Sequence, residues 1–175
     1  MDNGRKARLT LAELALFGVL GALTFGAKFA MAALPNIEPV SLLVMLFAVT
    51  FGWKALYPVC VYVLLEFLVF GVSLWSIPYL YVWPLLAAAA CLLREMTHPL
   101  AWALVSGAFG LCFGALCALI YLFMGGVTAA IAWWIEGIPF DLLHCAGNFV
   151  LTLVLFCPLR RLLERLYAAM RRRVE

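Results

Sequence analysis

Long apolar runs dominate this sequence and restrict what it can fold into. Of its 175 residues, 67% are hydrophobic and only 12% are charged, and its mean hydropathy is +1.09. A soluble domain of this size leaves much of its surface in water, and it is about half apolar and a quarter charged. A soluble globule and a disordered chain are therefore both excluded. We expect an all-α, polytopic membrane protein with a single membrane domain over residues 1–175.

Six apolar segments are candidates for membrane-spanning helices, since about 20 helical residues cross a bilayer core. The expected spans cover residues 9–34, 40–52, 55–72, 78–93, 100–124 and 138–157. The second is short, so both five and six spans remain open. The apolar stretch 127–135 is too short to span, and we expect a re-entrant or surface helix there. Residues 159–175 place arginines between apolar positions at helical spacing, which indicates an amphipathic cytoplasmic tail or a continuation of the sixth helix.

The basic residues predict the orientation of these spans. With six spans, eleven of the twelve lysines and arginines fall on the side that holds both termini. That side receives Arg5, Lys6, Arg8, Lys54, Arg94, Arg160, Arg161, Arg165, Arg171, Arg172 and Arg173. Because cytoplasmic loops carry the excess of Lys and Arg, we expect both termini in the cytoplasm. The first run is longer than the 7–15 apolar residues of a signal peptide, so we expect it to span the membrane uncleaved.

Polar side chains inside the apolar runs mark a candidate binding site, because a central charge costs about 2.5–3.5 kcal/mol on insertion scales. Lys28, Glu66 and Asp141 lie in three different spans, each in the half nearer the external side. His144 and Asn148 follow Asp141 at i+3 and i+7 and share its helix face. We therefore expect a polar pocket that opens to the outside. The alternatives are a structural Lys28–Glu66 ion pair and interhelical hydrogen bonds from His144 and Asn148.

Aromatic residues and one loop extend this candidate pocket. The aromatic candidates near the external end are Trp75, Tyr79, Tyr81, Trp83 and Trp133. An interfacial aromatic belt accounts for part of them, and the excess over the cytoplasmic side suits a pocket that stacks a flat ligand. The loop 34–39 adds Asn36 and Glu38 at the same level, where it could serve as a lid.

Small residues recur at four-residue intervals in two of the expected spans. The first stripe is Gly18, Ala22, Gly26 and Ala30, and the second is Ser106, Gly110, Gly114 and Ala118. Such stripes let helices approach closely in lipid. At about 100° per residue, Lys28 points about 200° away from Gly26, so one face of the first helix can dock a partner while the other addresses the pocket. Packing inside the bundle is the alternative, and it is favoured for the second stripe.

Motifs for catalysis, metal binding or nucleic-acid binding do not appear. The sequence has no GxxxxGK[ST] phosphate loop, no HExxH and no GxSxG. Its six cysteines match no CxxC spacing, and a net charge of +3 without a motif does not indicate nucleic acid. We therefore expect a binding protein without a catalytic site, a metal or a cofactor of its own.

Several of these features together resemble the substrate-binding (S) component of energy-coupling factor (ECF) vitamin transporters. The resemblance covers roughly residues 9–158 and lies in the six-helix size, the first small-residue stripe and the loop Leu34-Pro35-Asn36-Ile37-Glu38-Pro39-Val40. Its most specific part is the segment Gly137-Ile138-Pro139-Phe140-Asp141-Leu142-Leu143-His144, with Asn148 beyond it. Glycines stand in the stripe where the family pattern has alanines.

The resemblance implies a function that composition does not show. S components sit in prokaryotic cell membranes, bind a vitamin or related micronutrient near the external face and use the first loop as a gate. They dock through small residues of the first helix onto a transmembrane coupling subunit, and two ATPase subunits power uptake. The branch that this chain looks most like is associated with cobalamin, with pantothenate second. The competing hypotheses are a structural or assembly protein, and a membrane-embedded enzyme with Glu66, Asp141 and His144 as acid and base.

Overall fold

The computed structural model describes residues 9–34 and 36–174, with side chains as far as Arg172. Its elements are α1 (Leu11–Ala30), α2 (Val40–Phe51), the 3-10 helix η1 (Gly52–Ala55), α3 (Leu56–Phe70), α4 (Tyr79–Leu92), α5 (Pro99–Ala118) and α6 (Tyr121–Val174). Four stretches are long and apolar enough to cross a membrane, namely α1, Val40–Phe70, α5 and α6, and α4 is a shorter apolar helix. The all-α class is confirmed for this part of the chain, and the helices fit a membrane protein.

Some sequence positions used above lie outside the described residues. These are Arg5, Lys6, Arg8, Pro35 and the side chain of Arg173.

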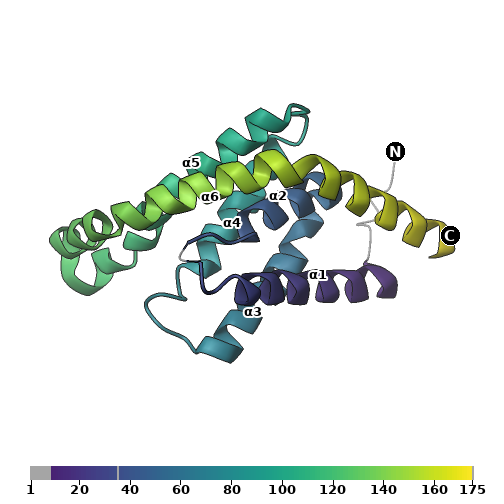
Figure 1. Cartoon of the computed structure of the whole chain (residues 1–175). Helices are drawn as coiled ribbons and strands as arrows, with labels where there is room; N and C mark the ends of the chain where they lie inside the picture. Colours follow the sequence, from purple (N-terminus) through teal and green to yellow (C-terminus); the bar gives the residue numbers. More distant parts are fainter. Residues whose placement is uncertain (1–8, 35, 175) are drawn as a thin grey trace, which may run out of the picture.

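The short helix α2 is the centre of the bundle. Nine of its twelve residues are buried, and it packs against α4 and α6. Twelve residues extend only about 18 Å, less than the roughly 30 Å of a hydrocarbon core. The irregular segment before α2, described at residues 31–34 and 36–39, connects α1 to α2 and runs into the bundle (Figure 1). Irregular backbone is tolerated at membrane depth where it is buried in protein or lines a cavity.

Helices α1 and α3 run parallel and meet at a glycine that the sequence analysis did not single out. A Cβ at Gly21 would lie 2.5 Å from Val61 Cβ and 2.7 Å from the Pro58 carbonyl oxygen, so only glycine allows this approach. The first small-residue stripe lies on another face of α1. Ala22, Gly26 and Ala30 are exposed, and a Cβ at Gly18 or Gly26 would meet nothing within 4 Å. Internal packing is therefore the wrong alternative for the first stripe, which faces out of the bundle.

Helices α5 and α6 form an antiparallel hairpin that uses the second stripe. A Cβ at Gly110 would lie 2.8 Å from the His144 backbone, and one at Gly114 would collide with the Asp141 carboxylate. The chain reverses at Gly126, whose φ of 74° lies in the left-handed region that glycine adopts without steric cost. Internal packing is therefore confirmed for the second stripe.

The expected boundaries at the end of the chain are partly wrong. The fifth span was expected to continue to residue 124, but α5 ends at Ala118 and a turn precedes α6. Residues 127–135 are not a separate re-entrant helix, because they form the first turns of the long helix that follows Gly126. That helix also continues through Pro139 and Pro158 instead of starting and ending beside them. A proline removes one backbone hydrogen bond, and a membrane helix tolerates this loss as a kink.

Residues 127–174 would extend about 70 Å at 1.5 Å per residue, more than twice the thickness of a hydrocarbon core. Of the two alternatives for residues 159–175, continuation of the sixth helix holds as far as Val174. Figure 1 shows α6 running along the whole length of the molecule.

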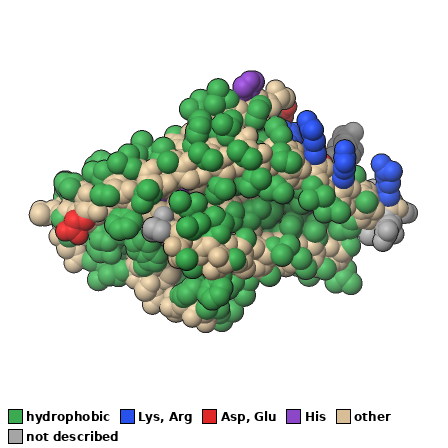
Figure 2. Space-filling view, viewed as in Figure 1, with side chains coloured by type: hydrophobic (Ala, Val, Ile, Leu, Met, Phe, Trp, Pro, Cys, Tyr) green, Lys and Arg blue, Asp and Glu red, His purple; other side chains and the backbone are tan. Residues whose placement is uncertain are grey.

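One end of the bundle is held by a carboxylate with three partners. Glu13 accepts hydrogen bonds from Lys54 Nζ at 2.6 Å, from Tyr167 Oη at 2.7 Å and from the backbone N–H of Thr10. The start of α1, η1 and the C-terminal part of α6 therefore lie together at this end (Figure 1). Figure 2 shows lysines and arginines gathered at the same end, while hydrophobic side chains cover most of the face shown.

Candidate ligand-binding site

The opposite end of the bundle holds a cavity of about 440 Å³. Its walls come from α1, the segment 31–39, α3, the residues before and at the start of α4, α5 and α6. The lining residues are Phe25, Lys28, Phe29, Met31, Ala32, Leu34, Asn36, Ile37, Glu38, Glu66, Phe70, Ser73, Trp75, Ser76, Tyr79, Phe113 and His144. A cavity of this size matches pockets that bury a small organic ligand.

Lys28 and Glu66 form an ion pair in the wall of this cavity. Lys28 Nζ lies 2.9 Å from Glu66 Oε2 and 3.2 Å from Tyr79 Oη, and 4.8 Å from the centroid of the Tyr79 ring. The Glu66 side chain is almost completely buried, and that of Lys28 is 22% exposed. The structural ion pair considered above is therefore present, and its two members also line the cavity.

His144 is the most deeply buried polar side chain in the cavity wall. It is 2% exposed, and neither ring nitrogen has a hydrogen-bond partner among the described residues. Its Nε2 lies 4.0 Å from Glu38 Oε1, which is too long for a hydrogen bond but within ion-pair distance if the ring is protonated. Buried polar groups are nearly always hydrogen-bonded, so this unpartnered imidazole in the cavity wall is unusual.

Glu38 lies in the segment 31–39, which is a wall of the cavity. Burial raises the pKa of its carboxyl to about 7, with Glu66 adding to the rise and Lys28 opposing it. A Cβ at Gly147 would lie 3.3 Å from Ile37, so the segment packs directly on the α6 backbone. Asn36 has a φ of 55°, a left-handed conformation that Asn tolerates. The loop 34–39, for which a lid was one possibility, therefore packs against α6 at Ile37 and forms a wall of the cavity at Glu38.

A second cavity of about 400 Å³ adjoins the first and shares three lining residues with it, Asn36, Trp75 and Phe113. Asp141 lines only this second cavity. Its Oδ1 accepts a hydrogen bond from the Gly114 backbone N–H at 2.8 Å, while its buried Oδ2 has no partner among the described residues. The predicted site residues therefore divide between two adjoining cavities.

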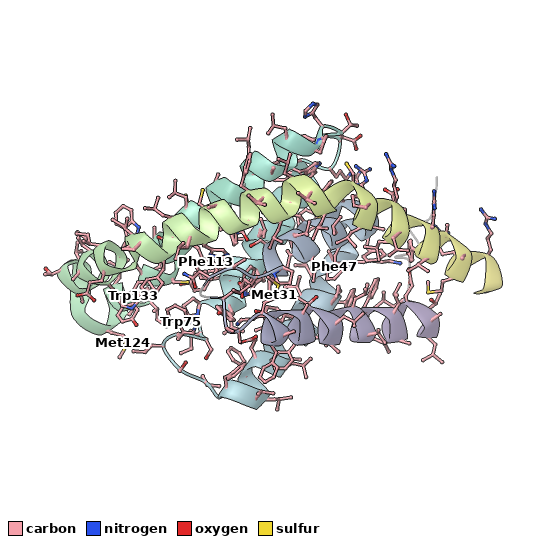
Figure 3. All side chains as sticks on the ribbon, in the orientation of Figure 1. Met31, Phe47, Trp75, Phe113, Met124 and Trp133 are labelled. Atoms are coloured by element: carbon pink, nitrogen blue, oxygen red, sulfur yellow. The ribbon has the colours of Figure 1, made fainter. Side chains whose placement is uncertain are left out.

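Aromatic side chains surround both cavities. The Trp75 and Trp133 ring centroids lie 5.9 Å apart, and Trp133 also stacks on Tyr121. The Phe113 ring lies 4.7 Å from the His144 ring in an edge-to-face arrangement. Figure 3 shows Trp75, Phe113 and Trp133 gathered in one region of the bundle. These rings offer flat apolar surface beside the polar groups.

Three predicted site residues do not line either cavity. Tyr81 donates a hydrogen bond to the Leu116 carbonyl oxygen at 2.8 Å. Trp83 is fully buried among aromatic rings, of which Tyr79 and Phe113 also line the main cavity. Asn148 donates to the Ser41 hydroxyl at 3.0 Å and to the Ser106 carbonyl oxygen at 3.3 Å. The interhelical hydrogen bonds considered as an alternative are therefore present for Asn148, but not for His144.

The sequence analysis did not identify several lining residues. They include Phe25, Phe29, Phe70, Phe113 and Glu136. The phenylalanines lie in uniformly apolar runs, where nothing distinguishes a cavity-facing ring from one that faces lipid. Glu136 could have been found as the one acidic residue in the apolar stretch between the fifth and sixth expected spans.

Comparison with protein-family models, with curated proteins and with solved structures finds no match to this chain. A function for this chain is therefore inferred from the residues of the site alone.

Proposed function

We propose that this chain is the substrate-binding subunit of an ECF-type importer, which captures a vitamin or related micronutrient for ATP-driven uptake. The observation that carries the proposal is the main cavity, in which Lys28, Glu66 and His144 from three helices meet Glu38 from an inserted loop. Burying this many ionisable groups in an apolar bundle is costly unless they pair with one another or serve a ligand, and the ring nitrogens of His144 have no partner among the described residues. In such a subunit the cavity would lie at the external face of a prokaryotic cell membrane. Six helices would span the membrane, and both termini would lie in the cytoplasm.

The outward small-residue face of α1 supports the proposed partners. This face carries the stripe of Gly18, Ala22, Gly26 and Ala30, which points out of the bundle. A helix of a transmembrane coupling subunit could therefore pack closely against it. The two ATPase subunits would then associate through that subunit, and this chain would need no nucleotide site of its own. Cobalamin and pantothenate are the candidate substrates from the family resemblance.

A binding measurement on the purified full-length chain tests this function. We expect one compound from a mixture of water-soluble vitamins to be retained, and Lys28→Ala and Asp141→Ala to weaken its binding at least tenfold. Lys54→Ala is the matched control, because it also breaks an ion pair but at the other end of the bundle. If neither cavity variant affects binding, or if Lys54→Ala has the same effect, the assignment of the site is wrong.

A structural or assembly role is the second candidate, and the buried hydrogen bonds of Asn148 favour it. It predicts that no vitamin is retained and that each polar substitution lowers stability instead. Turnover of a retained compound by the isolated chain would favour the enzyme hypothesis.

A further inference from the structure

The two adjoining cavities contain more negative than positive groups. Among the described residues that line them, four are carboxylates and one is a lysine. The carboxylates are Glu38, Glu66, Glu136 and Asp141. The charge of Lys28 is already engaged, because its Nζ is 2.9 Å from Glu66. The acidic excess therefore falls on Glu136 and Asp141, and on the ionised fraction of Glu38, since burial raises the pKa of its carboxyl to about 7.

Two of these carboxylates line the cavities and have oxygens without a hydrogen-bond partner among the described residues. Asp141 is 4% exposed, and its Oδ2 has no partner among the described residues. Glu38 Oε1 lies 4.0 Å from His144 Nε2, and neither nitrogen of that ring has a hydrogen-bond partner among the described residues. An ionised carboxylate is an acceptor only, so the group that satisfies it must be a donor or a cation. Glu38 lines the main cavity and Asp141 the second one, and the two cavities share Asn36, Trp75 and Phe113, so a ligand that lies across these shared residues could donate to both carboxylates.

The wall between these carboxylates is aromatic. Trp75 and Phe113 line both cavities, and Tyr79 lines the main one. Aromatic faces attract a cation as well as a flat ring, since their quadrupole is negative over the face. Lys28 already uses the Tyr79 ring in this way, at 4.8 Å. Trp75 is 53% exposed and has no such partner among the described residues.

We infer that the ligand, on the function proposed above, is a positively charged heteroaromatic molecule that carries amino groups, and that the site discriminates against anions. The ring of the ligand lies against Trp75 and Phe113, and its N–H groups donate hydrogen bonds to Asp141 Oδ2 and to the Glu38 carboxylate. An added carboxylate or phosphate would meet the acidic excess without a free cation to balance it. Both substrates that the family resemblance suggests are therefore disfavoured, since pantothenate is an anion and cobalamin is not a cationic aminoheterocycle.

Retention from a defined mixture tests this inference. The purified full-length chain is incubated with a mixture of five vitamins. Thiamine is a cation with an aminopyrimidine ring, riboflavin and cyanocobalamin are uncharged, and pantothenate and biotin are anions. Retained compounds are identified by mass after gel filtration. We expect thiamine to be retained at least tenfold better than the others. Retention of an anionic or uncharged compound instead would overturn the inference and leave the proposed function standing, whereas retention of none would contradict both.

Two variants test the assigned contacts. Asp141→Asn and Glu38→Gln each remove a negative charge with little change of shape, and we expect each to weaken thiamine binding at least tenfold. Glu95→Gln is the control, because that side chain is 90% exposed and lines neither cavity. Unchanged affinity in both cavity variants would overturn the inference even if thiamine binds.

Discussion

Lys28 Nζ lies 2.9 Å from Glu66 Oε2, and this ion pair both joins α1 to α3 and borders the main cavity. The two roles can be separated by comparing single and double replacements. Removing one member of a buried pair leaves the other charge uncompensated, whereas replacing both with apolar residues is often neutral.

We expect Glu66→Leu to lower the free energy of unfolding by about 3 kcal/mol, since Lys28 would keep its charge in a mostly buried position. The double variant Lys28→Met with Glu66→Leu should recover most of this loss and still fail to bind ligand. Denaturant unfolding in detergent micelles, together with the binding assay, measures both effects. A double variant as unstable as the single one would show that the pair itself holds the bundle together.

Gly114 lies so close to Asp141 that a methyl group at this position would collide with the carboxylate. We expect Gly114→Ala to cost about 1–3 kcal/mol of stability through overpacking, and to displace Asp141 from the second cavity. Gly26→Ala is the matched control, because a Cβ there meets nothing within 4 Å. In a helix, that control should be neutral or more stable by up to about 1 kcal/mol. Equal thermal stability of the two variants would contradict the close packing of α5 on α6.

Tyr167 ties the C-terminal part of α6 to Glu13 with a hydrogen bond of 2.7 Å. Tyr167→Phe removes only the hydroxyl, and we expect it to lower the free energy of unfolding by about 1 kcal/mol. Tyr57→Phe is the control, since its ring stacks on Phe17 and would keep that contact. Limited proteolysis of α6 should also become faster in Tyr167→Phe alone. No difference between the two variants would mean that this bond does not hold the helix.

Glu38 makes stability depend on pH. Its pKa is about 7 in the folded chain, against an ordinary value of 4.5, because burial disfavours the carboxylate, as does the charge of Glu66. Between about pH 4.5 and 7 the folded state therefore retains a proton that the unfolded state has lost. The contribution of Glu38 to stability should therefore fall as the pH rises through this window and then level off. His144 opposes this trend, because its buried ring has no partner in the folded chain and takes up a proton in this range when the chain unfolds.

Comparison with Glu38→Gln isolates the contribution of Glu38. The decrease in melting temperature between pH 5 and 8 should be smaller in this variant than in the parent chain. An identical decrease would show that Glu38 is not the group responsible.

The outward face of α1 predicts the site of partner docking. We expect Ala22→Leu or Gly26→Leu to abolish co-purification of a coupling subunit with the tagged chain, since a bulky side chain prevents close helix approach. Ala146→Leu adds the same side chain to an exposed position of α6 and serves as the control. Both α1 variants should keep their affinity for ligand. Intact assembly in both would place the interface elsewhere.

The sequence was most informative about residues that are costly to bury. Lys28, Glu66 and His144 stand out in apolar runs, and the structure brings all three to one cavity. Asn148 stands out for the same reason, yet it bonds Ser41 and Ser106 in the bundle interior. An unusual polar residue therefore indicates that a partner exists, but not whether that partner is a ligand or another helix.

Other features depended on contacts between distant segments. The outward direction of Gly26 and the inward direction of Gly114 follow from which helix lies beside each, although both belong to similar stripes. Pro139 and Pro158 are strong break signals in a sequence, but their effect is decided by the neighbouring helices.

By itself, the sequence determined the helical class, the long apolar helices that fit a membrane protein and the ionisable residues that need partners, because transfer energies and helix length are local properties of the chain. Only the tertiary structure decided that the segment 31–39 enters the bundle and that the polar residues divide between two cavities. It did so because the packing of α2, α5 and α6 sets the depth and direction of each side chain, and that packing joins residues more than a hundred positions apart.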